Sequence, residues 1–167
     1  MSQPAGNLIE RYRKEFRAAL VALGAPLALI GAWALFAPQS WFDDFPGGGR
    51  HWVSAIGPYN EHLASDVGAF FLAIGGLLVF AAIVLERRLV QAALGALLVY
   101  SVPHLVYHLT ELDAYGTQDK ILNMISLSSI VVLPLVMLAL TREKVQSGTT
   151  VATPGVKTKG EVTYGTH

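Results

Sequence analysis

Four long apolar runs, separated by shorter polar segments, dominate the pattern of the chain. They cover residues 18–36, 65–85, 89–109 and 121–140. A helix needs about 20 mostly apolar residues to cross the hydrocarbon core of a bilayer, and each run is close to that length. The pattern therefore predicts an all-α, polytopic membrane protein whose residues 18–140 form one bundle of four transmembrane helices.

The shortest connection lies between the second and third runs, which only Glu86, Arg87 and Arg88 separate. So short a link predicts a tight antiparallel hairpin. The first run is longer than the apolar core of a signal peptide, about 7–15 residues, which favours a retained span over a cleaved leader.

The remaining segments differ in character. Residues 1–17 place Leu8, Ile9, Tyr12 and Phe16 at helical spacing among basic residues, which predicts an interfacial helix or, alternatively, a solvated basic leader. The outer loop, residues 37–64, is rich in aromatic residues of the kind that form interface belts. The tail, residues 141–167, lacks apolar periodicity and is predicted to be disordered and cytoplasmic.

Composition agrees with a membrane protein. Of the 167 residues, 53% are hydrophobic and only 14% are charged, against about 25% charged in a soluble domain. The chain has no cysteine, which excludes disulfides, zinc–thiolate sites, iron–sulfur clusters and thiol catalysis. No phosphate loop, serine triad or basic nucleic-acid patch is present in the sequence, so nucleic acid is not an expected partner.

The net charge of zero hides an uneven distribution. With the four spans as predicted, ten of the 12 Lys and Arg residues lie on the side of the two termini, and Arg50 and Lys120 are the exceptions. Basic residues are enriched in cytoplasmic segments of membrane proteins. The sequence therefore predicts a multi-pass protein of the cytoplasmic (inner) membrane with both termini in the cytoplasm.

Two pairs of polar residues mark the predicted outer ends of the second and third spans. His62 and Asp66 are four residues apart, as are His104 and His108. Residues at this spacing share one helix face and lie about 6 Å apart along the axis. Because the second span begins where the third ends, the hairpin could bring the two pairs together.

Three imidazoles and a carboxylate suit a transition metal such as Zn, Cu or Fe. The leading prediction is thus a metal site for metal handling or redox chemistry, with His62, Asp66, His104 and His108 as ligands. Glu61 and Glu111 could orient the imidazoles. Tyr100 lies one turn below His104 on the same face and completes the candidate cofactor-binding residues.

Other functions fit the same residues. The histidines could form only hydrogen bonds, in an accessory subunit that assembles with other membrane subunits or with copies of itself. A haem could be held by His62 and a histidine of the third span, with room provided by Gly68, Gly75, Gly76 and Gly95, although small residues more often permit close helix packing. A quinone pocket is a further alternative. The residues do not decide between an enzyme and a binding protein.

A resemblance adds to this picture. The stretch DVGAFFLAIGGLLVFAA, residues 66–82, followed by a short basic turn and a third apolar span, resembles the small four-helix DoxX-like membrane proteins. The likeness covers the four spans, up to Leu140. It implies a four-helix bundle in the cytoplasmic membrane, and some DoxX-like proteins are linked to quinone-dependent oxidoreductase assemblies. His62, His104 and His108 are not part of that family's pattern.

Overall fold

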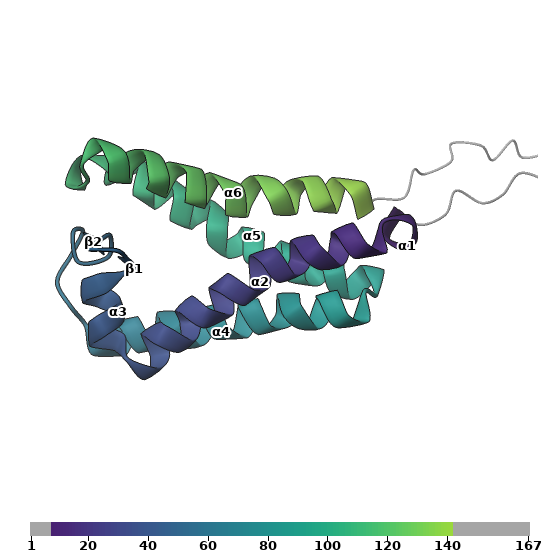
Figure 1. Ribbon diagram of the computed structural model, residues 1–167, viewed down its shortest axis with the longest axis horizontal. Helices are drawn as coiled ribbons and strands as arrows, with labels where there is room; N and C mark the ends of the chain where they lie inside the picture. Colours follow the sequence, from purple (N-terminus) through teal and green to yellow (C-terminus); the bar gives the residue numbers. More distant parts are fainter. Residues whose placement is uncertain (1–7, 142–167) are drawn as a thin grey trace, which may run out of the picture.

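The computed structural model describes residues 8–141, which form six α-helices, one short 3-10 helix and two short strands (Figure 1). In chain order these are α1 (Leu8–Arg11), α2 (Arg13–Phe36), α3 (Pro38–Asp44), β1 (Pro46–Gly47), β2 (Arg50–His51), α4 (Glu61–Val84), α5 (Arg87–Thr110), η1 (Leu112–Ala114) and α6 (Thr117–Thr141). The predicted disordered tail lies outside the described residues from position 142 onward.

Helices α2, α4, α5 and α6 are 24, 24, 24 and 25 residues long and apolar enough to cross a membrane. They correspond to the four predicted spans, so the number and order of the long helices are confirmed. Helix α4, the second of the four long helices, begins at Glu61, four residues before the predicted apolar run. The side chain of Asn60 accepts a hydrogen bond from the backbone N–H of Leu63 at 3.0 Å, which caps the helix there.

The short connection between α4 and α5 confirms the predicted hairpin. Leu85 adopts a left-handed conformation (φ 55°) that ends α4. The carboxylate of Glu86 then caps α5 by accepting hydrogen bonds from the backbone N–H groups of Arg88 (3.0 Å) and Leu89 (2.8 Å). These two bonds hold the pKa of Glu86 below its ordinary value of 4.5.

Replacing Glu86 with alanine is therefore expected to lower the thermal stability of the purified protein at pH 7. A carboxyl whose pKa is lowered by folding stabilises the folded state above its unfolded pKa, and that contribution is lost as the pH falls through the folded value. The difference in melting temperature between wild type and Glu86→Ala should therefore shrink in acid. A difference that grows on acidification, measured by thermal unfolding in detergent, would contradict this role.

The interface between α2 and α4 is built on glycine. A β-carbon placed on Gly31 would lie 2.3 Å from the backbone nitrogen of Leu72, and one on Gly68 would lie 2.4 Å from that of Leu35. Gly24 and Gly75 approach the facing helix almost as closely. Small residues let two helix backbones pack at short range. Gly68 and Gly75 therefore serve close helix packing, the alternative to leaving room for a haem. At Gly76 and Gly95, by contrast, nothing lies within 4 Å of a β-carbon built on the backbone.

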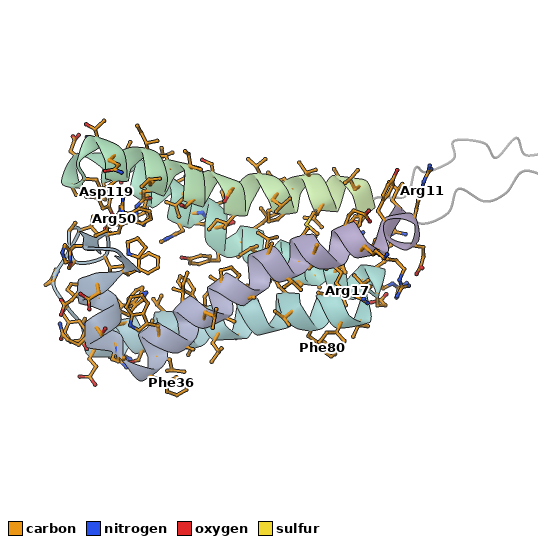
Figure 2. The ribbon with its side chains drawn as sticks, viewed as in Figure 1. Arg11, Arg17, Phe36, Arg50, Phe80 and Asp119 are labelled. Carbon is orange, nitrogen blue, oxygen red and sulfur yellow. The ribbon has the colours of Figure 1, made fainter. Side chains whose placement is uncertain are left out.

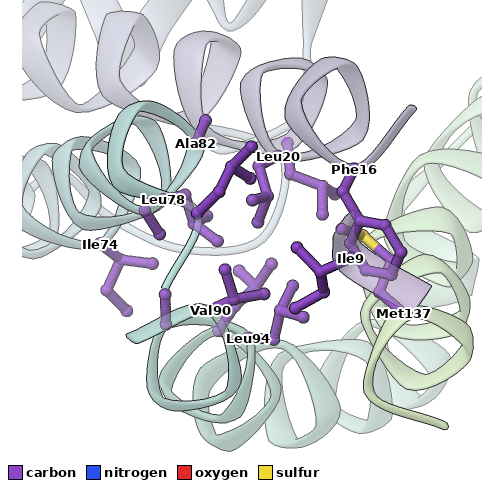
Figure 3. Close-up of a cluster of buried hydrophobic side chains, with 14 residues drawn as sticks. Ile9, Phe16, Leu20, Ile74, Leu78, Ala82, Val90, Leu94 and Met137 are labelled. Carbon is purple, nitrogen blue, oxygen red and sulfur yellow. The ribbon is translucent and has the colours of Figure 1, made fainter. Parts of the chain in front are cut away.

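One end of the bundle has a continuous apolar core, shown in Figure 3. We call it the inner end; it holds α1 and the α4–α5 turn. The core contains side chains from α1, α2, α4, α5 and α6, among them Ile9, Phe16, Leu20, Leu78, Val90, Leu94 and Met137. Ile9 is fully buried. This face of the predicted interfacial helix therefore packs into the bundle, while Leu8 and Tyr12 stay exposed.

At the opposite, outer end the predicted loop is folded. Residues 38–59, which we call the outer cap, contain α3 and a two-stranded hairpin whose turn has positive φ angles at Gly47, Gly48 and Gly49. Trp41 and Trp52 are at most 9% exposed. Both rings pack against Phe45, with a centroid distance of 6.1 Å in each contact. These aromatic residues thus form the interior of a small folded unit.

The long helices are splayed. Toward the outer end α2 diverges from α6, and the outer cap lies across the space between them (Figure 1). The bundle is therefore closed by apolar packing at its inner end and by the cap at its outer end.

Candidate functional site

The four predicted metal ligands form two separate pairs. His62 Nε2 lies 3.3 Å from the Asp66 carboxylate, and these side chains are 89% and 65% exposed. The rings of His104 and His108 lie 4.6 Å apart, centroid to centroid, in an edge-to-face arrangement. Within residues 8–141, no three His, Asp or Glu side chains are grouped closely enough to hold a metal ion together. Metal binding itself stays a prediction.

The rotation of α4 explains why the pairs do not converge. At 3.6 residues per turn, His62 and Asp66 lie on the opposite side of the helix from Gly68 and Gly75. Those glycines pack against α2, so the His62–Asp66 pair is turned away from the bundle. On α5, by contrast, His104 and His108 continue the buried face that includes Leu97.

His104 and His108 line a cavity of about 1000 Å³ between the four long helices, which extends from the outer cap to just past the helix midpoints. Most of its wall is apolar, with Leu27, Ile30, Val67, Phe71 and Ile130 from the helices and Trp41 and Trp52 from the outer cap. The polar lining includes Tyr100, His104, His108 and Asn123. Cavities that bind small molecules have this character, since apolar walls give contact area and a few polar groups fix orientation.

Aromatic rings form a column along one side of the cavity. Tyr100 stacks on His104 with ring centroids 4.9 Å apart, and His104 contacts His108. The column continues to Tyr115, whose ring is nearly parallel to that of His108 at 6.3 Å. Phe71 packs edge-on against Tyr100 at 5.1 Å. The column runs from the middle of α5 to its outer end.

The outer end of the column is hydrogen-bonded. The Tyr115 hydroxyl donates to the carbonyl oxygen of Trp52 at 2.8 Å and lies 3.5 Å from His108 Nδ1. Burial raises the pKa of Tyr115 to about 12, so the hydroxyl keeps its proton near neutral pH. Because the hydroxyl proton is donated to Trp52, the Tyr115 oxygen can accept a hydrogen bond from His108 when Nδ1 is protonated. Nε2 of a neutral His108 is then an acceptor.

The inner end of the column has free polar groups. Neither Tyr100 nor His104 makes a side-chain hydrogen bond with any residue between 8 and 141, although both line the cavity. The buried Asn123 oxygen also lacks a partner within the described residues. An unpaired buried polar group costs about 1–3 kcal/mol. Tyr100 and His104 are half-buried, and their polar groups are available to pair with a molecule in the cavity.

Of the three candidate cofactor-binding residues, only Tyr100 lines the cavity. Glu61 is exposed in the first turn of α4, and Glu111 is half-buried at the end of α5. Within the part of the chain that the structure describes, neither glutamate is hydrogen-bonded to a histidine. Sequence reasoning missed Asn123, Trp52 and Tyr115. A lone amide within an apolar run could have indicated Asn123, but nothing in the sequence pairs Tyr115 with Trp52.

Comparison with protein-family models, with curated proteins and with solved structures finds no match for this chain, so the resemblance to DoxX-like proteins stays a prediction.

Proposed function

We propose that this is a multi-pass protein of the cytoplasmic membrane, with both termini in the cytoplasm, that binds a quinone-type molecule in the cavity. The four long apolar helices and the uneven distribution of basic residues support the membrane assignment. One observation supports the ligand: Tyr100 and His104, which have no side-chain hydrogen bond within residues 8–141, lie in a mostly apolar cavity.

The chemistry of a quinone matches these groups. Its two carbonyl oxygens accept hydrogen bonds, and the Tyr100 hydroxyl and one N–H of a neutral His104 can donate them. Its flat ring suits a site lined by Tyr100, Phe71 and His104, because aromatic rings favour stacked and edge-on contacts. A reduced quinol would donate instead, and each neutral imidazole also offers an acceptor nitrogen. The same residues therefore suit both oxidation states.

The test is to purify the protein in mild detergent and measure the binding of added quinone, together with the quinone extracted from the purified sample. We expect His104→Ala to weaken binding roughly tenfold, which corresponds to about 1.4 kcal/mol. Tyr100→Phe should weaken it by a smaller factor, since one neutral hydrogen bond contributes about 0.5–1.5 kcal/mol.

His62→Ala is the matched control, because it removes an exposed imidazole that does not line the cavity. Its quinone affinity should equal that of wild type. Failure of the wild-type protein to bind quinone, or equal losses in His62→Ala and His104→Ala, would refute the proposal. An accessory subunit would instead purify with a partner protein and without quinone.

Transition-metal binding is the second candidate, favoured by the close packing of His104 and His108 in one cavity. Two imidazoles supply only half of a four-coordinate site. Elemental analysis of the same samples tests this candidate. Bound Cu, Zn or Fe that is lost in His104→Ala but retained in His62→Ala would favour a metal at the α5 pair.

A further inference from the structure

The cavity is covered at its outer end. The guanidinium of Arg50 in β2 lies 2.8 Å from the carboxylate of Asp119 in α6, as Figure 2 shows. The Tyr115 hydroxyl bonds the backbone of Trp52 at 2.8 Å. These two contacts fasten the outer cap to the α5–α6 side, although the cap follows α2 in the chain. Trp41 and Trp52 then form the roof of the cavity.

The side of the cavity is open between α2 and α6. Lining residues of α2 that are also exposed are Ala22 and Pro26, and those of α6 are Ser126, Ser129 and Leu133. Pro26 and Ser129 lie close to the midpoints of their helices. The opening is therefore at the depth of the bilayer centre if the four helices span the membrane. Asn60, Leu63 and Tyr107 form a second exposed part of the lining, nearer the outer end.

Packing elsewhere keeps this opening in place. Glycines draw α2 onto α4. At the inner end α2 and α6 share a core through Phe16 and Met137, and toward the outer end the two helices diverge (Figure 1). Three of the five side chains at the gap are small: Ala22, Ser126 and Ser129. The Ser126 and Ser129 hydroxyls bond backbone oxygens of their own helix, at 2.8 and 2.7 Å. They therefore leave no unpaired donor against an apolar chain.

From this we infer that the ligand of the cavity is a long-tailed, lipid-phase molecule whose head lies at Tyr100 and His104 and whose tail leaves between α2 and α6 into the hydrocarbon. The inference rests on the proposed function. His104 is about six residues above the midpoint of α5, or roughly 9 Å along the axis. A tail shorter than this would end inside the cavity, and a longer one would pass through the opening.

The experiment fills the opening and compares two quinones, one with a long isoprenoid tail and one with none. In the double variant Ala22→Trp/Ser129→Trp, we expect the dissociation constant of the tailed quinone to rise at least roughly tenfold. That of the tail-less quinone should stay within about twofold, because the head site is untouched. Retained binding of the tail-less quinone also shows that the variant is folded.

The matched control is Leu29→Trp/Ile125→Trp, which adds indoles to exposed positions of the same two helices outside the cavity. It should bind both quinones as wild type does. The inference is overturned if the filled variant binds the tailed quinone normally, or if Leu63→Trp at the outer rim blocks the tailed quinone instead. If wild type binds neither quinone, the proposed function fails as well, so the two failures are distinguishable.

Discussion

Alanine at Gly75 is expected to destabilise the protein by about 1–3 kcal/mol, whereas alanine at the adjacent Gly76 should not destabilise it. A β-carbon on Gly75 would lie 2.5 Å from the backbone nitrogen of Ala28 and 2.7 Å from the carbonyl oxygen of Gly24. Both are backbone atoms of α2, so relief requires the two helices to move apart. Gly76 has open space at the same position. There, alanine only stiffens the helix, which favours folding by about 0.5–1 kcal/mol.

Unfolding of the two variants in detergent, followed by circular dichroism, gives the comparison directly. The residues are neighbours in one helix and undergo the same chemical change, so helix propensity cancels between them. Gly31→Ala should behave like Gly75→Ala or worse, since its β-carbon would lie 2.3 Å from a backbone nitrogen. Equal melting temperatures for Gly75→Ala and Gly76→Ala would show that α2 and α4 are not packed as described.

Phenylalanine at Tyr115 is expected to loosen the outer cap. The substitution keeps the buried ring but leaves the Trp52 carbonyl oxygen without its donor, at a cost of about 1–3 kcal/mol. Arg50→Gln should add less, up to about 1 kcal/mol, because the side chains of Arg50 and Asp119 are 29% and 32% exposed. The double variant should therefore expose the cap to solvent more often than either single change.

Hydrogen exchange of the backbone amides in residues 45–53 measures this opening. The control is Lys120→Ala, which breaks the ion pair with the fully exposed Asp113 and should leave exchange unchanged. Faster exchange confined to the cap in Tyr115→Phe, with the α2–α4 glycine interface still protected, is the expected pattern. Equal effects of Lys120→Ala and Tyr115→Phe would mean that the buried bond does not hold the cap.

Much of the architecture follows from local patterns. Apolar runs of the right length identify the four long helices, and a three-residue link identifies the α4–α5 hairpin. The outer cap does not follow, because its fold depends on Trp41, Phe45 and Trp52 packing on one another rather than facing lipid. The same limit applies to Gly75 and Gly76, whose sequence surroundings are nearly identical but whose helix faces differ.

The candidate site illustrates a similar limit. Four-residue spacing correctly places His104 beside His108 and His62 beside Asp66. Whether two such pairs meet depends on how each helix is rotated about its axis, and that is set by packing against a third helix. Gly68 and Gly75 are seven residues apart and so share one face of α4, and this spacing in the sequence indicates a closely packed face. Their packing against α2 places His62 on the opposite, exposed side of α4.

The position of the tryptophans has a spectroscopic consequence. The chain contains three, Trp33, Trp41 and Trp52, and all belong to the outer end of α2 or to the cap. Two of them line the cavity. The ultraviolet emission of the unlabelled protein therefore comes from the neighbourhood of the cavity, while the inner core contributes no indole signal. An electron-accepting ring held beneath that roof would quench this emission, so occupancy can be followed by light without attaching a probe.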